Sequence, residues 1–406
     1  MMEEEGKKDF FTRIAPFSAC LWLLCVLNTV FVWFPFGIYL RYIAFCGVVV
    51  ISLVIAKTSY ANKNVWPIFF TFLFLVWISV HYGISATLRN VASFVPLLLL
   101  YAWPKSLLYS SYKLFRYVVL FFCVGSSVIT VLSFVGLTNS IPFFEMPAQS
   151  PLHINRGDYY YVYGIFPELH SVGDVFYRAC GMMEEPGHFS VILGLIYIID
   201  RITHRIINPL IIICAVLTFS SNFFFAVFFV ELKNFFHLRT KVLLWVTGLV
   251  VFSFIIYHAL PREMQDTVYN IAYERNFGKA SETYNETSSF TSLLDNRANA
   301  HGTRLYNSMT TEELAIGGLG DKNVVLSDYR GMILNYGWIG LMISWSILLA
   351  LIYKLDKVLL IGVLLYIFII FLHRSWMYFL PYMYFFVFLV ASFCQKNMIY
   401  GRISKK

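Results

Sequence analysis

Long apolar stretches alternate with short polar ones along most of the chain, and Lys, Arg, Pro, Gly or Asn stand at their boundaries. A helix needs about 20 apolar residues to cross the hydrocarbon core of a bilayer. The pattern therefore predicts about twelve membrane-spanning helices, or eleven if the chain does not break at Ser220-Ser221-Asn222. They are expected near residues 17–34, 37–56, 65–83, 90–103, 113–136, 187–200, 206–220, 222–236, 241–260, 329–353, 356–372 and 376–394.

Two longer polar stretches interrupt this pattern and divide the chain. In the second one, Pro261 can open a helix, and Thr310 and Glu313 have capping-box spacing, so short helices are expected there. The predicted class is an all-α polytopic integral membrane protein. Its expected parts are 1–136 with five spans, a loop at 137–186, 187–260 with four spans, a loop at 261–328, and 329–406 with three spans and a tail.

The composition agrees with a membrane protein and excludes an ordinary soluble domain. The chain is 59% hydrophobic and 13% charged, where soluble domains average about 25% charged residues. The net charge of +8 does not indicate a nucleic-acid partner, because 40 Phe and 27 Tyr lie largely in apolar runs.

Lys and Arg are distributed differently along the predicted topology. If both termini are cytoplasmic, as the positive-inside rule indicates, 19 cations lie inside and 12 outside, and the two large loops face outward. On this count 13 of 15 Lys are inside, whereas 10 of 16 Arg are outside. A general need for positive charge on the outer side would be met by Lys as well as by Arg, so it does not explain why the outward cations are mostly Arg.

Five of these outward arginines stand at predicted membrane edges. A guanidinium binds phosphate through a planar fork of donors, which Lys lacks, so the set suits a lipid-linked phosphate or pyrophosphate. Alternatively, each arginine pairs with a nearby carboxylate or extends to lipid headgroups. The five are Arg41, Arg89, Arg178, Arg330 and Arg374.

Acidic residues and a histidine gather where the sixth span begins. Glu184 and Glu185 precede Pro186, and His188 follows two residues later. The dipole of a helix N-terminus favours a carboxylate there and so explains one of the two acids. Two adjacent carboxylates with an imidazole suggest instead a general base that takes the proton of a sugar hydroxyl. Glu185 and Glu184 are the first candidates, and His301 and Asp328 are the alternatives.

The first loop contains an aromatic run from Tyr159 to Tyr163, followed by Glu168 and His170. Flat aromatic faces flanked by carboxylates suit sugar rings, although a strand or an interfacial aromatic belt gives the same pattern. The predicted glycan-binding residues are Tyr159, Tyr160, Tyr161, Tyr163, His188, Arg297 and Arg304.

Several motifs of other function classes are absent. The sequence has no nucleotide-binding loop, no compact His-x-x-x-His metal spacing and no acid in the first outward turn, Pro35-Phe36-Gly37. Inverted repeats and paired broken helices, which indicate secondary transporters, are not recognisable either.

With two large outward loops, the layout resembles that of the Wzy-type O-antigen and polysaccharide repeat-unit polymerases. The resemblance includes the entry Arg178-x(5)-Glu-Glu-Pro-Gly-His-Phe189, the late Gly318-Leu-Gly320 and Ser327-Asp328-Tyr329, and the run Asn335-Tyr-Gly-Trp-Ile-Gly-Leu341. In the turn Thr218-Phe-Ser-Ser-Asn222, Asn222 stands where that family often has Arg.

This resemblance implies a multi-pass enzyme of the bacterial inner membrane, similar in plan to glycosyltransferases of the C type, with its active site facing the periplasm. It would join undecaprenyl-pyrophosphate-linked glycans without a metal or other cofactor, with the bilayer and a chain-length regulator as further partners and no nucleic acid. Two alternatives remain. One is the related O-antigen ligase, which usually carries a His-Asn pair where this chain has Ser327-Asp328, and the other is a lipid-oligosaccharide flippase.

Overall fold

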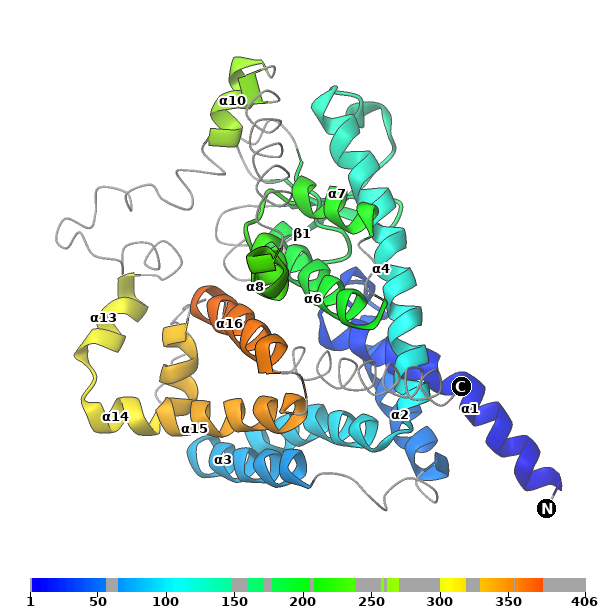
Figure 1. The fold of residues 1–406 in the computed structure, drawn as a ribbon, viewed down its shortest axis with the longest axis vertical. Helices are drawn as coiled ribbons and strands as arrows, with labels where there is room; N and C mark the ends of the chain where they lie inside the picture. Colours follow the sequence, from blue (N-terminus) through cyan, green and yellow to red (C-terminus); the bar gives the residue numbers. More distant parts are fainter. Residues whose placement is uncertain are drawn as a thin grey trace.

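The computed structural model of the chain is mainly helical (Figure 1). It describes residues 2–55, 65–147, 159–170, 177–204, 208–237, 257–258, 261–269, 300–318, 329–353, 355 and 357–374. The predicted span near 376–394 and nearly all of that near 241–260 lie outside these residues, so the twelve-span count stays a prediction.

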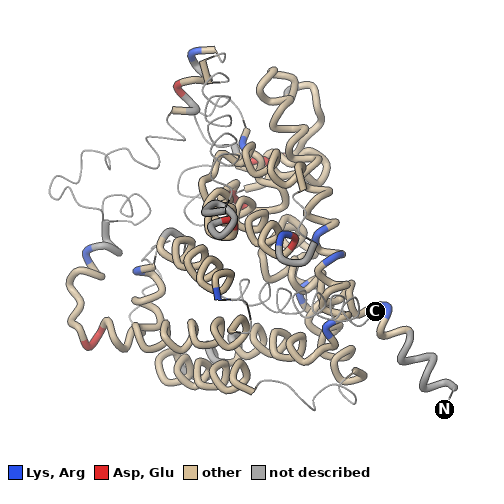
Figure 2. Tube along the Cα trace, in the orientation of Figure 1, with Lys and Arg blue, Asp and Glu red and all other residues tan. Residues whose placement is uncertain are grey.

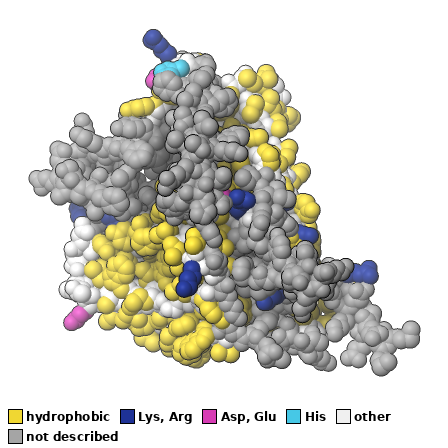
Figure 3. All heavy atoms as spheres, in the orientation of Figure 1, with side chains coloured by type: hydrophobic (Ala, Val, Ile, Leu, Met, Phe, Trp, Pro, Cys, Tyr) yellow, Lys and Arg dark blue, Asp and Glu magenta, His cyan; other side chains and the backbone are white. Residues whose placement is uncertain are grey.

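Among the described residues, three helices are long and apolar enough to cross a membrane: α2 (Gly37–Ile55), α4 (Lys105–Phe134) and α15 (Tyr329–Ile352). Shorter apolar segments lie in α1 (Met2–Val26), α8 (Asn222–His237) and α16 (Lys357–Arg374). Most of the helical length carries no charge (Figure 2), and hydrophobic side chains cover much of the described surface in Figure 3. These features are compatible with a membrane protein.

The predicted third and fourth spans form one helical element, α3 (Trp66–Ala102), which folds back on itself. The ring centroids of Phe74 and Phe94 lie 5.7 Å apart, whereas a straight helix would separate residues 20 positions apart by about 30 Å. The element therefore reverses between these two residues, and its two legs agree with the two predicted spans.

Two helices differ from the predicted spans, one in its length and the other in where it ends. The helix α7 (Pro209–Leu217) has nine residues and a length of about 14 Å, so this helix alone does not cross a core of about 30 Å as the span near 206–220 was expected to. The helix α1 ends at Val26, because Asn28 adopts a positive φ of 51° before the short 3-10 helix η1 (Val30–Val32).

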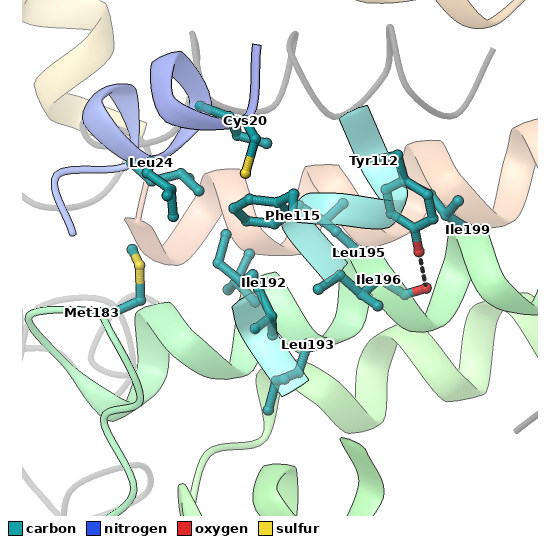
Figure 4. Close-up of a cluster of buried hydrophobic side chains, with 14 of the residues drawn as sticks. Cys20, Leu24, Tyr112, Phe115, Met183, Ile192, Leu193, Leu195, Ile196 and Ile199 are labelled. Carbon is teal, nitrogen blue, oxygen red and sulfur yellow. Dashed lines mark hydrogen bonds between the residues drawn. The ribbon is translucent and has the colours of Figure 1, made fainter. Parts of the chain in front are cut away.

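The helix α6 (Pro186–His204) lies at the centre of the fold and is buried along nearly its whole length. Figure 4 shows Ile192 and Ile196 of α6 packed with Phe115 of α4 and Leu24 of α1. The helices α4 and α6 run antiparallel, because Arg116 bonds to Asp200 near the end of α6, while Ser126, further along α4, bonds to Gly181 before α6 begins.

The first large loop folds into a three-stranded antiparallel sheet, so the all-α prediction was wrong in this part. Its strands are β1 (Phe144–Pro147), β2 (Tyr159–Tyr163) and β3 (Phe166–His170), in the order β1-β2-β3. Aromatic residues favour extended backbone, and Gly164, with φ of +67°, permits the tight turn between β2 and β3.

The second large loop contains the short helices α10 (Arg262–Tyr269), α13 (Ala300–Ser308) and α14 (Thr311–Ile316) within its described residues. The predicted capping box is confirmed. The Thr310 hydroxyl accepts from the Glu313 backbone N–H at 3.3 Å, and the Glu313 carboxylate accepts from the Thr310 N–H at 2.8 Å.

The helix α15 is interrupted at Gly337, whose φ of +66° is not helical. The Asn335 carbonyl accepts bonds from the Tyr82 hydroxyl and the Gly318 N–H, and the Trp77 indole donates to the Tyr336 carbonyl at 2.8 Å. Neighbouring side chains and backbone groups thus donate hydrogen bonds to the carbonyls that the break leaves without helical partners, as an apolar environment requires. The sequence pattern predicted one uninterrupted span near 329–353, without this break.

Candidate functional site

The segment that precedes α6 is held by hydrogen bonds from three directions. The Met182 carbonyl accepts from the Val30 N–H at 2.9 Å, and the Glu184 carbonyl accepts from the Tyr160 hydroxyl at 2.9 Å. The Ala179 N–H donates to the Leu217 carbonyl at 3.0 Å. Because η1, β2 and α7 all contact this segment, its side chains occupy defined positions.

A fourth contact involves a buried acid, Glu168 of β3, which is fully shielded from solvent. One carboxyl oxygen accepts from the Ser126 hydroxyl at 2.5 Å and the other from the Cys180 N–H at 3.3 Å. The Gly181 N–H in turn donates to the Ser126 hydroxyl at 3.0 Å. Burial raises the pKa of Glu168 well above its usual range, more than these bonds lower it.

Glu168 was noted in the sequence only as an acid beside an aromatic run. Its structural importance depends on Ser126, which lies 42 positions earlier, and no local sequence pattern indicates such a contact. The one local signal is that Glu168 stands two positions from both Phe166 and His170, so the three side chains would share one face of a strand.

Two of the four predicted base candidates, Glu184 and Glu185, lie beside His188 at the start of α6. Glu184 and His188 are buried, at 3% and 2% exposure, whereas the Glu185 side chain is 13% exposed. His188 Nε2 lies 3.6 Å from Glu185 Oε2. Glu185 is therefore the more accessible of the two carboxylates, with an imidazole beside it that can share a proton.

Arg178 lies in the same neighbourhood and is half-buried. Burial and Glu168 raise the pKa of the Cys180 thiol, and the charges of Arg178 and Glu185 also act on it, the first lowering and the second raising it. No carboxylate in the described part of the chain forms an ion pair with Arg178.

The turn from Thr218 to Asn222 also reaches this site. Asn222 donates its side-chain N–H to the Gly187 carbonyl at 3.1 Å, and the Ser190 hydroxyl accepts from the Phe223 N–H at 3.0 Å. The predicted break at this turn is confirmed, with Phe219 at a positive φ of 48°. Asn222 therefore binds the backbone of the first turn of α6.

The remaining predicted arginines are spread over several helices. Arg330 is buried in the first turn of α15, and Arg41 of α2 donates to the Asn28 side chain at 2.9 Å. Arg304 is exposed on α13. For Arg89 on α3, Arg374 on α16 and His301 on α13 the side chains lie outside the description, as do Arg297 and Asp328 entirely.

The four predicted glycan-binding tyrosines divide by burial. Tyr160 and Tyr163 are interior, at 0% and 5% exposure, and Tyr160 packs on Trp33 with centroids 4.9 Å apart. Tyr159 is 49% exposed and Tyr161 is half-buried. Burial gives Tyr160 and Tyr163 a packing role, so only Tyr159 and Tyr161 offer a ring face to a ligand.

Comparisons of the chain with protein-family models, with curated proteins and with solved structures find no match. The geometry at the start of α6 is therefore the evidence from which a function can be proposed. That geometry provides an accessible carboxylate, an adjacent imidazole and a guanidinium, which together suit proton transfer beside an anionic group.

Proposed function

We propose that the chain is a membrane glycosyltransferase that polymerises oligosaccharide repeats carried on undecaprenyl pyrophosphate, with its site on the outer face of the bacterial inner membrane. One observation carries this proposal: Arg178 lies in the hydrogen-bonded segment that leads into the buried helix α6, at whose start Glu185 and His188 lie 3.6 Å apart. The resemblance of the surrounding motifs to the Wzy-type polymerases supports it.

The contrast between the two ends of α6 supports a ligand-binding role for Arg178. At the far end, Arg116 is paired with Asp200 at 2.7 Å, and Arg201 is paired with Glu231. These two cations are neutralised within the protein, whereas Arg178 has no ion-pair partner in the described residues. A half-buried guanidinium in that situation suits an external anion such as a pyrophosphate.

The chemistry follows from these groups. A hydroxyl oxygen of the incoming lipid-linked repeat attacks the anomeric carbon of the growing glycan, and the bond from that carbon to the pyrophosphate oxygen breaks. Glu185 takes the hydroxyl proton, which His188 can share. Arg178 stabilises the negative charge that develops on the leaving pyrophosphate, with Arg330, Arg89, Arg374 and Arg41 as further predicted contributors.

A reconstituted assay tests this proposal. Purified protein in liposomes with lipid-linked repeats as the sole substrate should produce a ladder of longer lipid-linked chains. Arg178→Lys keeps the charge but loses the fork, so we expect at least a tenfold slower reaction. Arg201→Lys, the same change at the other end of α6, should retain activity.

Other outcomes would identify the alternatives. If, in a second reaction supplied with lipid-linked polymer and lipid A core, the wild-type protein moved polymer onto the core without lengthening it, the chain would be a ligase. If it moved lipid-linked repeats across the liposome membrane without joining them, the chain would be a flippase. Normal chain growth by Arg178→Lys would refute the role of Arg178 in binding pyrophosphate.

A further inference from the structure

Four aromatic side chains form a cluster beside the candidate site. The Phe143 ring lies 4.6 Å from that of Tyr161 and 5.6 Å from that of Tyr163, measured between centroids. Tyr177 completes the cluster at 6.1 Å from Tyr161 and 6.2 Å from Tyr163. Tyr163 is buried and supports the others, whereas Phe143 is 42% exposed.

An acid lies at the edge of this aromatic cluster. Glu145 of β1 pairs directly with Tyr161 of β2, so both side chains stand on the same face of the sheet. Burial raises the pKa of Tyr161 most, and the charges of Glu145 and Tyr177 raise it further, which places Glu145 near the phenol. Glu145 is exposed, and so is Tyr159 two positions along β2.

The aromatic cluster adjoins the candidate site at two points. Tyr177 is the residue before Arg178, and its backbone N–H is fixed by the Ser133 hydroxyl at 3.1 Å. Tyr160, the residue before Tyr161, donates from its hydroxyl to the Glu184 carbonyl at 2.9 Å. Tyr160 points to the opposite face of the sheet from Tyr161, so it fixes the sheet to the segment before α6, and a ligand lying on the cluster would extend toward Arg178 through Tyr177.

We propose that Phe143, Tyr161, Tyr177 and Glu145 form a carbohydrate platform that holds the sugar rings of the oligosaccharide whose lipid pyrophosphate binds at Arg178. This proposal rests on the proposed function. The aromatic faces would pack on the C–H faces of sugar rings, and the Glu145 carboxylate would accept hydrogen bonds from their hydroxyls. Such a mixture of apolar faces with a few placed polar groups is typical of small-ligand sites.

The charge of this surface favours sugar over a lipid surface. Within the described residues 141–147 and 159–170, Glu145 is the one exposed acid, since Glu168 is buried, and Lys and Arg are absent. By contrast, the exposed aromatics Tyr39 and Tyr42 of α2 flank Arg41, as is usual where a protein meets anionic headgroups. An exposed acid among aromatic rings is unfavourable at such an interface but useful for binding hydroxyls.

Binding of the sugar alone provides the test. The probe is the oligosaccharide released by mild acid from lipid-linked repeats of the cell that makes this protein, and it carries no lipid or phosphate. We expect this probe to bind the purified full chain in detergent, measured by saturation-transfer NMR and by native mass spectrometry. Tyr161→Ala and Glu145→Ala should weaken binding at least fivefold, whereas the control Tyr39→Ala should not.

Two results would overturn the platform. One is equal binding of the probe by wild type and Tyr161→Ala. The other is weaker binding of anionic phospholipid by Tyr161→Ala in native mass spectrometry with unchanged sugar binding, which would assign the cluster to the membrane surface. If wild type polymerises lipid-linked repeats but Tyr161→Ala does so equally well, the platform fails and the proposed function stands. If wild type binds the probe without polymerising, the proposed function fails and the platform stands.

Discussion

The hydroxyl of Ser126 and the carboxyl of Glu168 lie 2.5 Å apart and join helix α4 to strand β3. Through this pair, the backbone N–H groups of Cys180 and Gly181 also find acceptors. One buried contact thus connects a predicted membrane helix, the sheet of the first loop and the segment that carries Arg178. The position of the candidate site depends on it.

Removing the Glu168 side chain should destabilise the protein. Glu168→Ala leaves the Ser126 hydroxyl and the Cys180 N–H without an acceptor in a buried place, at a cost of about 1–3 kcal/mol for each unsatisfied group. Glu168→Gln retains an acceptor oxygen and should cost much less. Thermal unfolding of the detergent-solubilised protein measures both, and equal midpoints for the two variants would contradict the hydrogen-bonding role.

The raised pKa of Glu168 also predicts how stability varies with pH. The folded protein binds the Glu168 proton more tightly than the unfolded chain does. This contribution to stability is therefore complete below the pKa of an ordinary glutamate, about 4.3, and is lost as pH rises through the higher folded pKa. Unfolding midpoints across this range should fall less steeply for Glu168→Gln than for wild type. Parallel curves would show that Glu168 is not protonated in the fold.

The sequence pattern was sufficient for features that depend on neighbouring residues. Apolar length located α2, α15 and α16, and the spacing of Thr310 and Glu313 located the start of α14. Features that depend on distant residues were not predictable. The burial of Glu168 requires a hydrogen bond from Ser126. The break in α15 requires Trp77 and Tyr82 to donate to the carbonyls that the break frees, and the position of Gly337 in the run from Asn335 to Leu341 does not indicate these donors.

The site was predicted in part for the same reason. Glu184, Glu185 and His188 are close in sequence, so a helix start brings them together whatever the rest of the fold does. Burial then distinguishes Glu185 from Glu184, and it removes Tyr160 and Tyr163 from the glycan-binding set. Burial of this kind is decided by packing against Trp33 and Phe143, which the alternation of residues on a strand does not specify.

Gly337 should not tolerate a side chain. An added Cβ would lie 2.3 Å from the Ala315 carbonyl oxygen, and the backbone φ is +66°. Gly136 has a similar φ of +71° but open space around it, so Gly136→Ala measures the strain alone, about 1 kcal/mol. Gly337→Ala should lower the unfolding midpoint clearly more than Gly136→Ala. Equal shifts would indicate that the contact between α14 and α15 gives way easily.

Glu185 should be essential for polymerisation, and Glu184 should matter less. Glu185→Gln keeps the size and hydrogen-bonding capacity of the side chain but cannot accept a proton, and loss of a general base usually costs about 10²–10⁴ in rate. Glu184 is buried, and its backbone carbonyl, which Tyr160 binds, is unchanged in Glu184→Gln, so that variant should lose less than tenfold. The measurement is the rate of chain lengthening from lipid-linked repeats, with the folded fraction of each variant determined in parallel. A fully active Glu185→Gln together with an inactive Glu184→Gln would make Glu184 the general base. Full activity of both variants would place the general base elsewhere, with His301 and Asp328 as the next candidates.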